Sequence, residues 1–443
     1  MFSPKLVLNQ NTTMKIINST HVNPFGGLNF VLEEFDKQGI GKLLEQNLPK
    51  LPNQCKYRWK DILYSFWSIY LCGGDCIEDL GNNLRKSLQV IPYMQVPSPD
   101  RILDRFKELA LPYDIFSVPR GKSIHQFSLN SYLNELNIKI SKTLGILENG
   151  LTLDYDNTII YTKKSDSKRT YKKEFGYCPG VATIGNTVVF IENRNGNSDA
   201  KTLQFETLTR MFQILKEQKV SIKNFRADGA SYQLDIVDLV QKQVSKFYLR
   251  ANINNTLAKA IATIDTWEKV SLGSEDAYRG ETVYTPFINS GKRFKKEHKL
   301  KEYRLIVTKT LRNDSQINLF TNESFNYSAI LTNDNLKTQN EIVDFYNQRG
   351  SAEKEFDILK NDFGWNNLPF SKLEQNTVFL LFSAMCRNLY QYIIKTFANK
   401  FQGLKETFRI KKFIFRFISI PAKWIKSSRS YKLRLYGDIH FKT

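Results

Sequence analysis

Four side chains that can take part in chemistry are spaced regularly in the segment from Tyr346 to Lys360. If this segment is one helix, at about 100° per residue, all four fall within a sector of about 60°. They are Tyr346, Arg349, Glu353 and Lys360. One reading is a solvated helix face with an ion pair between Arg349 and Glu353. The other is a metal-binding carboxylate flanked by cations that hold phosphate.

Acidic residues lie within or just after two segments whose sequences predict strands. The run Leu151–Tyr161 is rich in β-branched and aromatic residues, which predicts a strand with Asp154 and Asp156 on one face. Asp is disfavoured inside strands, so two acids there indicate a role beyond structure. The run Val220–Arg226 predicts a later strand, which places Asp228 at its carboxyl end, before a helix. This is a frequent place for functional groups in open α/β sheets, although an N-cap is the alternative role.

A carboxylate-only metal site is the chemistry that these acids allow. The five cysteines and four histidines lack the spacing of metal ligands, so carboxylates are the expected donors. Asp156, Asp228 and Glu353 would raise one another's pKa if they converged, and a divalent cation would relieve that repulsion. Oxygen ligands favour Mg²⁺ or Mn²⁺. Two such ions can activate a nucleophile and stabilise the leaving oxygen of a phosphodiester.

The same residues match a known signature. The spacing of Tyr346, Arg349, Glu353 and Lys360 resembles the YREK signature of bacterial insertion-sequence transposases of the DDE type, which have a ribonuclease H-like catalytic core. The resemblance covers most of the chain, and its motifs occur in the family's order. The further matching segments are Leu153-Asp-Tyr-Asp-Asn-Thr158, Arg226-Ala-Asp-Gly-Ala230, Tyr346-Asn-Gln-Arg-Gly350, Lys360-Asn-Asp-Phe-Gly364 and Leu368-Pro369.

The resemblance implies a set of metal ligands. By it, Asp156, Asp228 and Glu353 are the catalytic acids and hold two Mg²⁺ or Mn²⁺ ions. The first strand departs from the pattern because it offers two acids. The Asp-x-Thr match favours Asp156, with Asp154 as its neighbour or as the true ligand.

The resemblance also implies contacts with DNA. Tyr346, Arg349 and Lys360 would contact phosphates of the transposon end near the cut. The family's β-rich insertion lies between the second Asp and the Glu, and in related transposases it helps to stabilise a hairpin or a flipped base. Trp267 is the aromatic residue that we expect to serve this purpose here.

The expected fold is α/β: a ribonuclease H-like mixed sheet flanked by helices, with a β-rich insertion, a helical N-terminal region and a basic C-terminal region. We expect five segments. They are a helical DNA-binding region (1–147), the first part of the core (148–252), the β-rich insertion (253–327), the second part of the core with the helix of the catalytic Glu (328–400), and a basic DNA-contacting region (401–443).

Within the insertion, three runs predict strands: Glu281–Pro286, Tyr303–Thr308 and Gln316–Phe320. A basic cluster, Lys292–Lys301, lies between them.

The overall charge indicates a polyanionic partner. The chain has 443 residues and carries 64 Lys+Arg against 44 Asp+Glu, a net charge of +20. Nucleic acid is the commonest partner of so basic a protein, and an anionic membrane surface is the competitor. Because no apolar run is long enough to span a bilayer and no signal-peptide pattern is present, we expect a cytoplasmic protein without membrane contact. The resemblance implies that it is bacterial and associated with the nucleoid.

The expected function is a DNA transposase of an insertion sequence. It would bind element ends and catalyse metal-dependent cleavage and strand transfer on double-stranded DNA, as a homodimer in the DNA complex, most simply by cut-and-paste. A related metal-dependent nuclease that cuts without joining uses the same acids. A catalytically inactive DNA-binding protein derived from a transposase is the third alternative, and the intact set of acids argues against it.

Overall fold

The acid-bearing strand expected after residue 150 is present as β5 (Leu151–Asn157) in a computed structural model of the chain. The structure describes residues 6–8, 12–14, 21–117, 123–147, 151–272, 275–288, 301–311, 324–428 and 430–442. The chain forms two compact units: a central unit (Leu103–Tyr392) and a terminal unit (Met1–Ile102 with Ile393–Thr443). The division of the chain into five segments stays a prediction.

The central unit is built on an 11-stranded mixed sheet. Three neighbouring strands at its middle, β12, β11 and β5, are parallel, and all other pairings are antiparallel. Their carboxyl ends therefore meet at one edge. In spatial order the strands are β13 (Glu268–Leu272), β14 (Glu275–Tyr284), β15 (Tyr303–Leu311), β16 (Phe325–Thr332), β12 (Lys246–Ala251), β11 (Ile222–Ala227), β5, β9 (Gly180–Ile184), β10 (Thr187–Arg194), β4 (Ile124–Leu129) and β3 (Asp114–Ser117).

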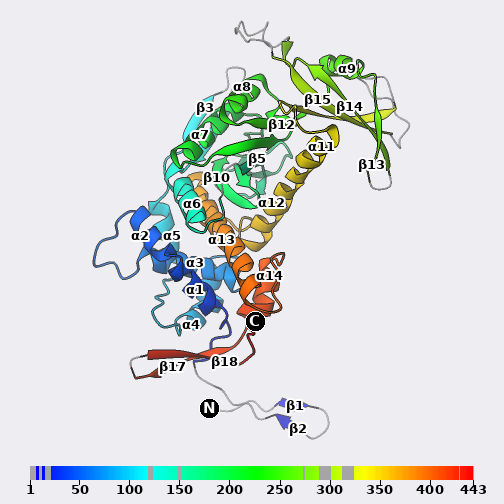
Figure 1. Cartoon of the computed structure of the whole chain (residues 1–443). Helices are drawn as coiled ribbons and strands as arrows, with labels where there is room; N and C mark the ends of the chain where they lie inside the picture. Colours follow the sequence, from blue (N-terminus) through cyan, green and yellow to red (C-terminus); the bar gives the residue numbers. More distant parts are fainter. Residues whose placement is uncertain are drawn as a thin grey trace. The chain divides into compact units, whose positions relative to one another are not determined.

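Helices cover both faces of this sheet (Figure 1). On one face the main core contains Leu153 and Tyr155 of β5 together with apolar residues of three helices, α6 (Ser131–Thr143), α7 (Gln204–Glu217) and α8 (Leu234–Gln243). On the other face a smaller core joins Tyr248, Ile306 and Ile330 to α11 (Gln339–Asn347). Side chains alternate along each strand, so Asp154 and Asp156 lie on the opposite face of β5 from Leu153 and Tyr155.

The region expected to be a separate β-rich insertion continues the same sheet. β13, β14, β15 and β16 pair in sequence, and β16 pairs with β12 of the core. The runs expected at Glu281–Pro286 and Tyr303–Thr308 are confirmed in part by β14 and in full by β15. A helix, α9 (Asn255–Ile261), precedes them. The run Gln316–Phe320 and most of the basic cluster Lys292–Lys301 lie outside the described residues.

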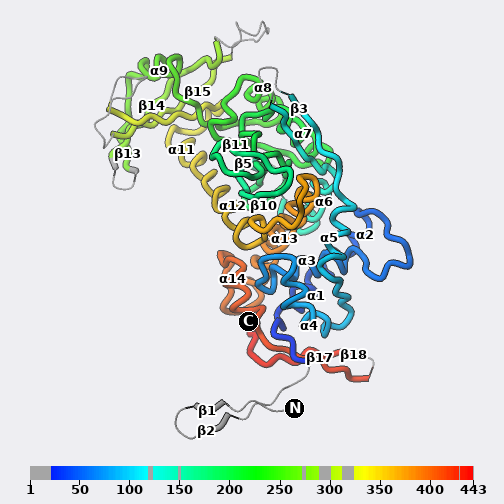
Figure 2. The backbone as a smooth tube through the Cα atoms, turned by 180° about the vertical axis from the view of Figure 1, so that it is seen from behind, coloured from blue at the N-terminus to red at the C-terminus, as the bar shows by residue number. Residues whose placement is uncertain are grey.

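The segment that carries the signature is not one helix. α11 ends at Asn347, a 3-10 turn follows at Gln348–Gly350, and α12 (Ser351–Asp362) begins after it. Figure 2 follows the backbone from α11 into α12. The prediction of a single uniform helix was therefore wrong at this turn, and the local change of twist separates Tyr346 and Arg349 from the regular face of α12.

The expected helical N-terminal region also contains strands. β3 and β4 fall within residues 1–147 and pair with each other at one edge of the large sheet, where β4 also pairs with β10. Asn130 caps α6, since its side chain accepts a hydrogen bond from the backbone N–H of Leu133 at 3.0 Å. This part of the chain thus supplies both an edge hairpin and a covering helix to the central unit. α13 (Leu373–Lys400) begins in the central unit and ends in the terminal unit.

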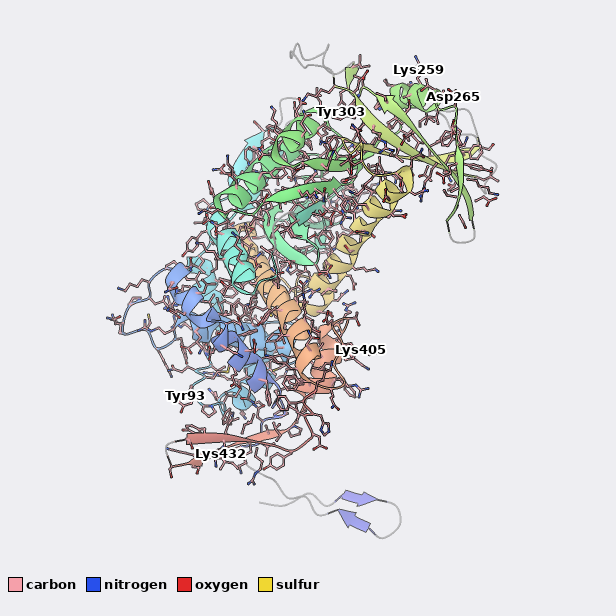
Figure 3. The ribbon with its side chains drawn as sticks, viewed as in Figure 1. Tyr93, Lys259, Asp265, Tyr303, Lys405 and Lys432 are labelled. Atoms are coloured by element: carbon pink, nitrogen blue, oxygen red, sulfur yellow. The ribbon has the colours of Figure 1, made fainter. Side chains whose placement is uncertain are left out.

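The terminal unit joins the two ends of the chain. Asn23 and Ala422 exchange two backbone hydrogen bonds of 2.8 Å each. Lys432 lies on a basic hairpin, and Figure 3 labels it there. The elements of this unit are β1 (Leu6–Leu8), β2 (Thr12–Met14), α1 (Leu28–Lys37), α2 (Ile40–Asn47), α3 (Trp59–Leu71), a π-helical turn (Leu80–Leu84), α4 (Arg85–Leu88), α5 (Pro99–Glu108, which enters the central unit), α14 (Ile410–Phe413), a second π-helical turn (Ile414–Ile418), β17 (Ala422–Ser427) and β18 (Ser430–Leu435).

In the part of the chain that the structure describes, no helix has both the length and the apolar character needed to cross a membrane.

Candidate active site

The candidate site lies where three parallel strands end. Asp156 is the penultimate residue of β5, Asp228 directly follows β11, and Asn252 directly follows β12. The strands are neighbours in the order β12-β11-β5, so these side chains start from one edge of the sheet. Asp156 and Asp228 were expected here. Asn252 was not, although the same criterion, a polar residue at the end of a strand, could have found it.

Asp154 is held in the sheet by a buried ion pair. Arg226, its neighbour on β11, donates from Nε and Nη2 to the two carboxylate oxygens at 2.7 Å each. Both side chains are buried, and the guanidinium also donates to the backbone carbonyl of Phe345 and lies against its ring. Both oxygens of Asp154 are therefore occupied by a partner from the same sheet. This pair ties β5 and β11 to the end of α11.

Asp156 is instead paired with the signature segment. Arg349 Nη2 lies 2.8 Å from Asp156 Oδ2, while the backbone N–H of Asn157 donates to Oδ1 at 2.8 Å. Burial chiefly raises the pKa of Asp156 to about 6, the charges of Asp228 and Glu353 raise it as well, and Arg349 opposes them. Asp228 and Glu353 are thus close enough to act electrostatically on Asp156, although the three residues are far apart in the sequence.

Asp228 does have the N-cap role that was its alternative. Its Oδ1 accepts a hydrogen bond of 3.0 Å from the backbone N–H of Ala230 at the start of a 3-10 turn (Gly229–Ser231). Asn252 braces this turn by donating to the carbonyl of Gly229 at 2.6 Å. A Cβ at Gly229 would stand 2.4 Å from Asn252 Oδ1, so a larger residue here would displace the Asn252 side chain. The cap fixes where the carboxylate of Asp228 stands.

Tyr346 is a buried residue that touches the same turn. Its ring is 7% exposed and belongs to the smaller core, and its hydroxyl donates to the carbonyl of Ala227 at 3.3 Å. Burial chiefly raises the pKa of this phenol, so the hydroxyl keeps its proton at neutral pH. Tyr346 therefore connects α11 to the residue that precedes Asp228.

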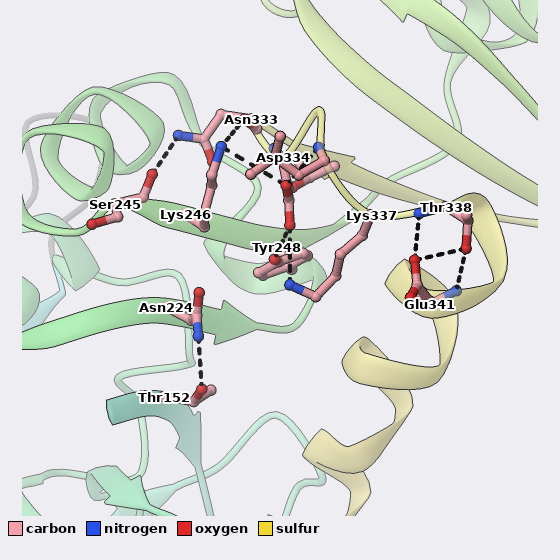
Figure 4. A network of polar contacts seen from close by, with 12 residues as sticks. Thr152, Asn224, Ser245, Lys246, Tyr248, Asn333, Asp334, Lys337, Thr338 and Glu341 are labelled. Atoms are coloured by element: carbon pink, nitrogen blue, oxygen red, sulfur yellow. Dashed lines mark hydrogen bonds and ion pairs between the residues drawn. The ribbon is translucent and has the colours of Figure 1, made fainter. Parts of the chain in front are cut away.

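The start of α11 is fixed by a polar network (Figure 4). Asp334 accepts hydrogen bonds from Tyr248 at 2.6 Å and from Lys337 at 3.3 Å. Although burial opposes it, these bonds lower the pKa of Asp334 to about 2. Thr338 and Glu341 then form a capping box, with distances of 2.7 and 3.3 Å. The helix that leads to Arg349 thus begins at a defined residue beside β12.

α12 presents Glu353 and Lys360 differently. Glu353 is exposed in the first turn, and Lys360 is half-buried, so that burial chiefly lowers its pKa. The helix is anchored by Glu355, which makes a buried pair with Arg387 of α13 through bonds of 2.9 and 3.1 Å. This anchor leaves Glu353 on the accessible side of α12.

Trp267 directly precedes β13, the outermost strand of the large sheet on this side, and is half-buried. Its indole N–H donates to the carbonyl of Ile264 at 3.1 Å, and Lys309 Nζ lies 4.0 Å from the ring centroid. The rings of Tyr278 and Phe325 also face this lysine. One face of the indole is therefore covered by a cation of the same chain.

Within the described residues, no group of three or more His, Cys, Asp or Glu side chains has the geometry of a metal site. Asp156 is engaged with Arg349 and Asp228 caps its turn, so in this arrangement the oxygens of the acids serve protein partners.

The central unit is a mixed α/β domain in which Asp156 and Asp228 lie at one edge of a large sheet flanked by helices. A family model described as Transposase DDE domain group 1 matches residues 22–442, nearly the whole chain. The protein belongs to this family of DDE transposases.

A search of curated proteins finds no match to the chain. Among solved structures, a piggyBac transposase synaptic complex with hairpin DNA is similar with a TM-score of 0.40 and 11% sequence identity, over 88% of this chain and 78% of that chain.

Proposed function

We propose that this DDE transposase is encoded by a bacterial insertion sequence, binds the ends of its element, and catalyses metal-dependent DNA cleavage followed by strand transfer. The proposal rests on its family membership. The observation that supports the site assignment is that Asp156 and Asp228 follow neighbouring parallel strands and that the charges of Asp228 and Glu353 both add to the rise that burial chiefly causes in the pKa of Asp156. A structural role alone gives no reason for acids on a second strand end and on a helix to act on the buried carboxylate of Asp156.

The donor set fits a divalent metal. Asp156, Asp228 and Glu353 are oxygen donors, which suit Mg²⁺ or Mn²⁺, and positive charge would relieve the repulsion of Asp156 by Asp228 and Glu353. When bound, two such ions would activate the attacking oxygen and stabilise the leaving oxygen of a phosphodiester. In the proposed assignment Asp154 is not a ligand, because Arg226 occupies both of its oxygens.

In this proposal Arg349 has two roles, neutralising Asp156 and binding a DNA phosphate. Its guanidinium neutralises Asp156 before metal binds, and its Nε is buried without a hydrogen-bond partner among the described residues. A buried donor without a partner is costly, and a DNA phosphate would satisfy it. Lys360 supplies a second cation on the same segment, for a neighbouring phosphate.

We propose different roles for Tyr346 and Trp267. The hydroxyl of Tyr346 already serves Ala227, so we propose that it positions the Asp228 turn in addition to the DNA contact implied by the signature. Trp267 remains our candidate for a base at the cut end. Lys309 would first have to leave its ring face, and a nearby phosphate would draw it away.

The same proposal includes a ribonuclease H-like relationship for the central sheet and a homodimer that cuts two element ends together. It also includes double-stranded DNA, both element ends and target, as substrate. The expected cytoplasmic, nucleoid-associated location follows from that substrate.

The test is cleavage of a labelled duplex that carries the flanking repeats of the protein's own gene, with Mg²⁺. Wild type should cut at the repeat boundary, and Glu353→Gln should reduce the rate by at least about 100-fold while binding the duplex normally. Glu217→Gln, an exposed helical glutamate of the same unit, is the matched control and should cut like wild type. A 3′-hydroxyl product that joins to target DNA would distinguish a transposase from a nuclease that only cuts.

Two results would count against the proposal. Equal cutting by wild type and Glu353→Gln would remove Glu353 from the site. Binding by both proteins without cutting by either would favour an inactive DNA-binding protein.

A further inference from the structure

A small second sheet of the central unit presents aromatic side chains to solvent. It consists of β6 (Ile160–Tyr161), β8 (Phe175–Tyr177) and β7 (Lys168–Arg169), in that spatial order. Tyr161, Tyr171 and Phe175 are 54, 65 and 39% exposed. We call residues 161–175 the platform. Large exposed aromatics that recur within one short segment indicate a binding surface.

Cations are interleaved with these rings. Residues 161–175 contain six Lys or Arg and two acids, and five of the six cations are exposed. Arg169 lies 5.5 Å from the ring centroid of Phe175, and Lys172 lies 5.3 Å from that of Tyr171. The platform therefore offers ring faces and positive charge together, which is the combination that binds nucleic-acid strands.

One of the two acids points into the protein and anchors the platform. Asp166 accepts hydrogen bonds from the hydroxyl of Tyr177 at 2.5 Å and from the backbone N–H of Leu373 at 2.7 Å. Behind the sheet, a Cβ at Gly196 would stand 2.3 Å from the carbonyl of Lys168 and 2.5 Å from that of Gly176. The backing is therefore tight. The backbone that carries the rings is thus held in place and loses little conformational freedom on binding, which favours affinity.

The platform adjoins the acids of the candidate site. β6 begins four residues after Asp156, and β8 leads directly into β9, which pairs with β5 beside Asp156. Partial burial chiefly raises the pKa of Tyr171, and the charges of Asp156 and Asp228 raise it further, so the phenol is within electrostatic reach of both acids.

We propose that the platform binds unpaired DNA next to the phosphate that is cut, with Tyr161, Tyr171 and Phe175 stacking on bases and the neighbouring Lys and Arg pairing with phosphates. The inference rests on the proposed function, because it places a DNA strand at Asp156. Unpaired bases are the favoured ligand, since the faces of paired bases are covered by stacking inside a duplex. An acidic protein would contact the cations but would give the aromatic rings no stacking partner.

The binding test needs no catalysis. Fluorescence anisotropy in EDTA would compare the full chain on a blunt duplex and on the same duplex with a tail of about five unpaired thymidines. Wild type should prefer the tailed duplex. The double variant Tyr161→Ala/Tyr171→Ala should bind the tailed duplex about 10-fold more weakly or worse and bind the blunt duplex unchanged.

Two controls separate stacking from other effects. Tyr171→Phe keeps the ring and should stay within about twofold of wild type. Tyr93→Ala removes another highly exposed tyrosine, in the terminal unit (Figure 3), and should have no effect on the binding of either probe.

The double variant Lys168→Gln/Lys172→Gln tests the phosphate contacts. It should weaken the binding of both probes and reduce the salt dependence of binding.

The outcomes are distinguishable from those of the cleavage test. Unchanged preference for the tail in Tyr161→Ala/Tyr171→Ala would overturn the platform, even if cutting depends on Glu353. Loss of the preference in that variant would support the platform, even if wild type failed to cut. A third result would be that an oligoglutamate peptide displaces both probes equally, from wild type and from Tyr161→Ala/Tyr171→Ala alike. That result would identify a general anion-binding surface and would also overturn the proposal.

Discussion

Arg349 donates to Asp156 across 193 residues of sequence, with Nη2 2.8 Å from Oδ2. Helix spacing alone predicts a different partner, Glu353, four residues away. None of the ion pairs among the described residues joins Arg349 to Glu353. The 3-10 turn at Gln348–Gly350 changes the direction of the guanidinium, and the carboxylate at the end of β5 receives it.

Removing Arg349 should raise the pKa of Asp156 further. That pKa is about 6 with the guanidinium in place, and the guanidinium lowers it. Arg349→Gln therefore moves the titration of Asp156 to higher pH. The measurement is carboxyl-carbon NMR on metal-free protein, and Lys354→Gln, an exposed cation of α12, is the control. A pKa that stays or falls in Arg349→Gln would contradict the pairing.

Neutralising Asp156 should stabilise the fold. Its pKa rises from 3.8 to about 6 on folding, so between those values the folded protein binds more protons and its stability falls as pH rises. Asp156→Asn should therefore raise the free energy of unfolding above pH 6, by up to about 3 kcal/mol, and the gain should vanish near pH 4. Urea denaturation across this range measures it. A variant that is less stable than wild type at neutral pH would refute the prediction.

Asp154 should behave in the opposite way. Asp154→Asn leaves the guanidinium of Arg226 buried without its charge partner, which costs about 3–5 kcal/mol. Replacing both residues, as in Asp154→Leu/Arg226→Met, should recover much of that loss. Thermal unfolding at pH 7 compares the three proteins. If Asp154→Asn were stable but lost Mg²⁺ binding by calorimetry, Asp154 would be a ligand and the assignment of Asp156 would fail.

Two glutamates of α12 should separate activity from stability. Glu353 is exposed, so Glu353→Gln should change the free energy of unfolding by less than about 0.5 kcal/mol. Glu355→Gln breaks the buried pair with Arg387 and should cost about 3–5 kcal/mol. Denaturant melts of both variants, beside their cleavage rates, test this contrast. Equal losses of stability would show that α12 is not anchored through Glu355.

Removing the hydroxyl of Tyr346 should affect rate more than binding. Tyr346→Phe keeps the ring in the smaller core and deletes only the bond to Ala227, at a cost of about 1 kcal/mol of stability. Because Ala227 precedes Asp228, we expect a cleavage rate lowered about 3- to 10-fold at unchanged DNA affinity. Weaker binding at an unchanged rate would instead assign Tyr346 to a direct phosphate contact.

Much of the local structure was predictable. The strand at Leu151, the hairpin of β9 and β10, and helix α7 follow from side-chain periodicity, which each segment carries by itself. The candidate acids also stood out in the sequence, because Asp and Glu at strand ends and on a helix face are local features. The spacing of the signature pointed to the DDE transposases, and the family match agrees with that class.

Partner choice was decided only by the tertiary structure. Periodicity places Asp154 and Asp156 on one face of β5 and treats them alike. Register against β11 gives Asp154 to Arg226, whereas the turn before α12 gives Asp156 to Arg349. These pairings depend on which strand lies beside which, and that is a long-range property of the packed chain. The pairing of β15 with β16, which makes the expected insertion continuous with the core sheet, was hidden from the sequence for the same reason.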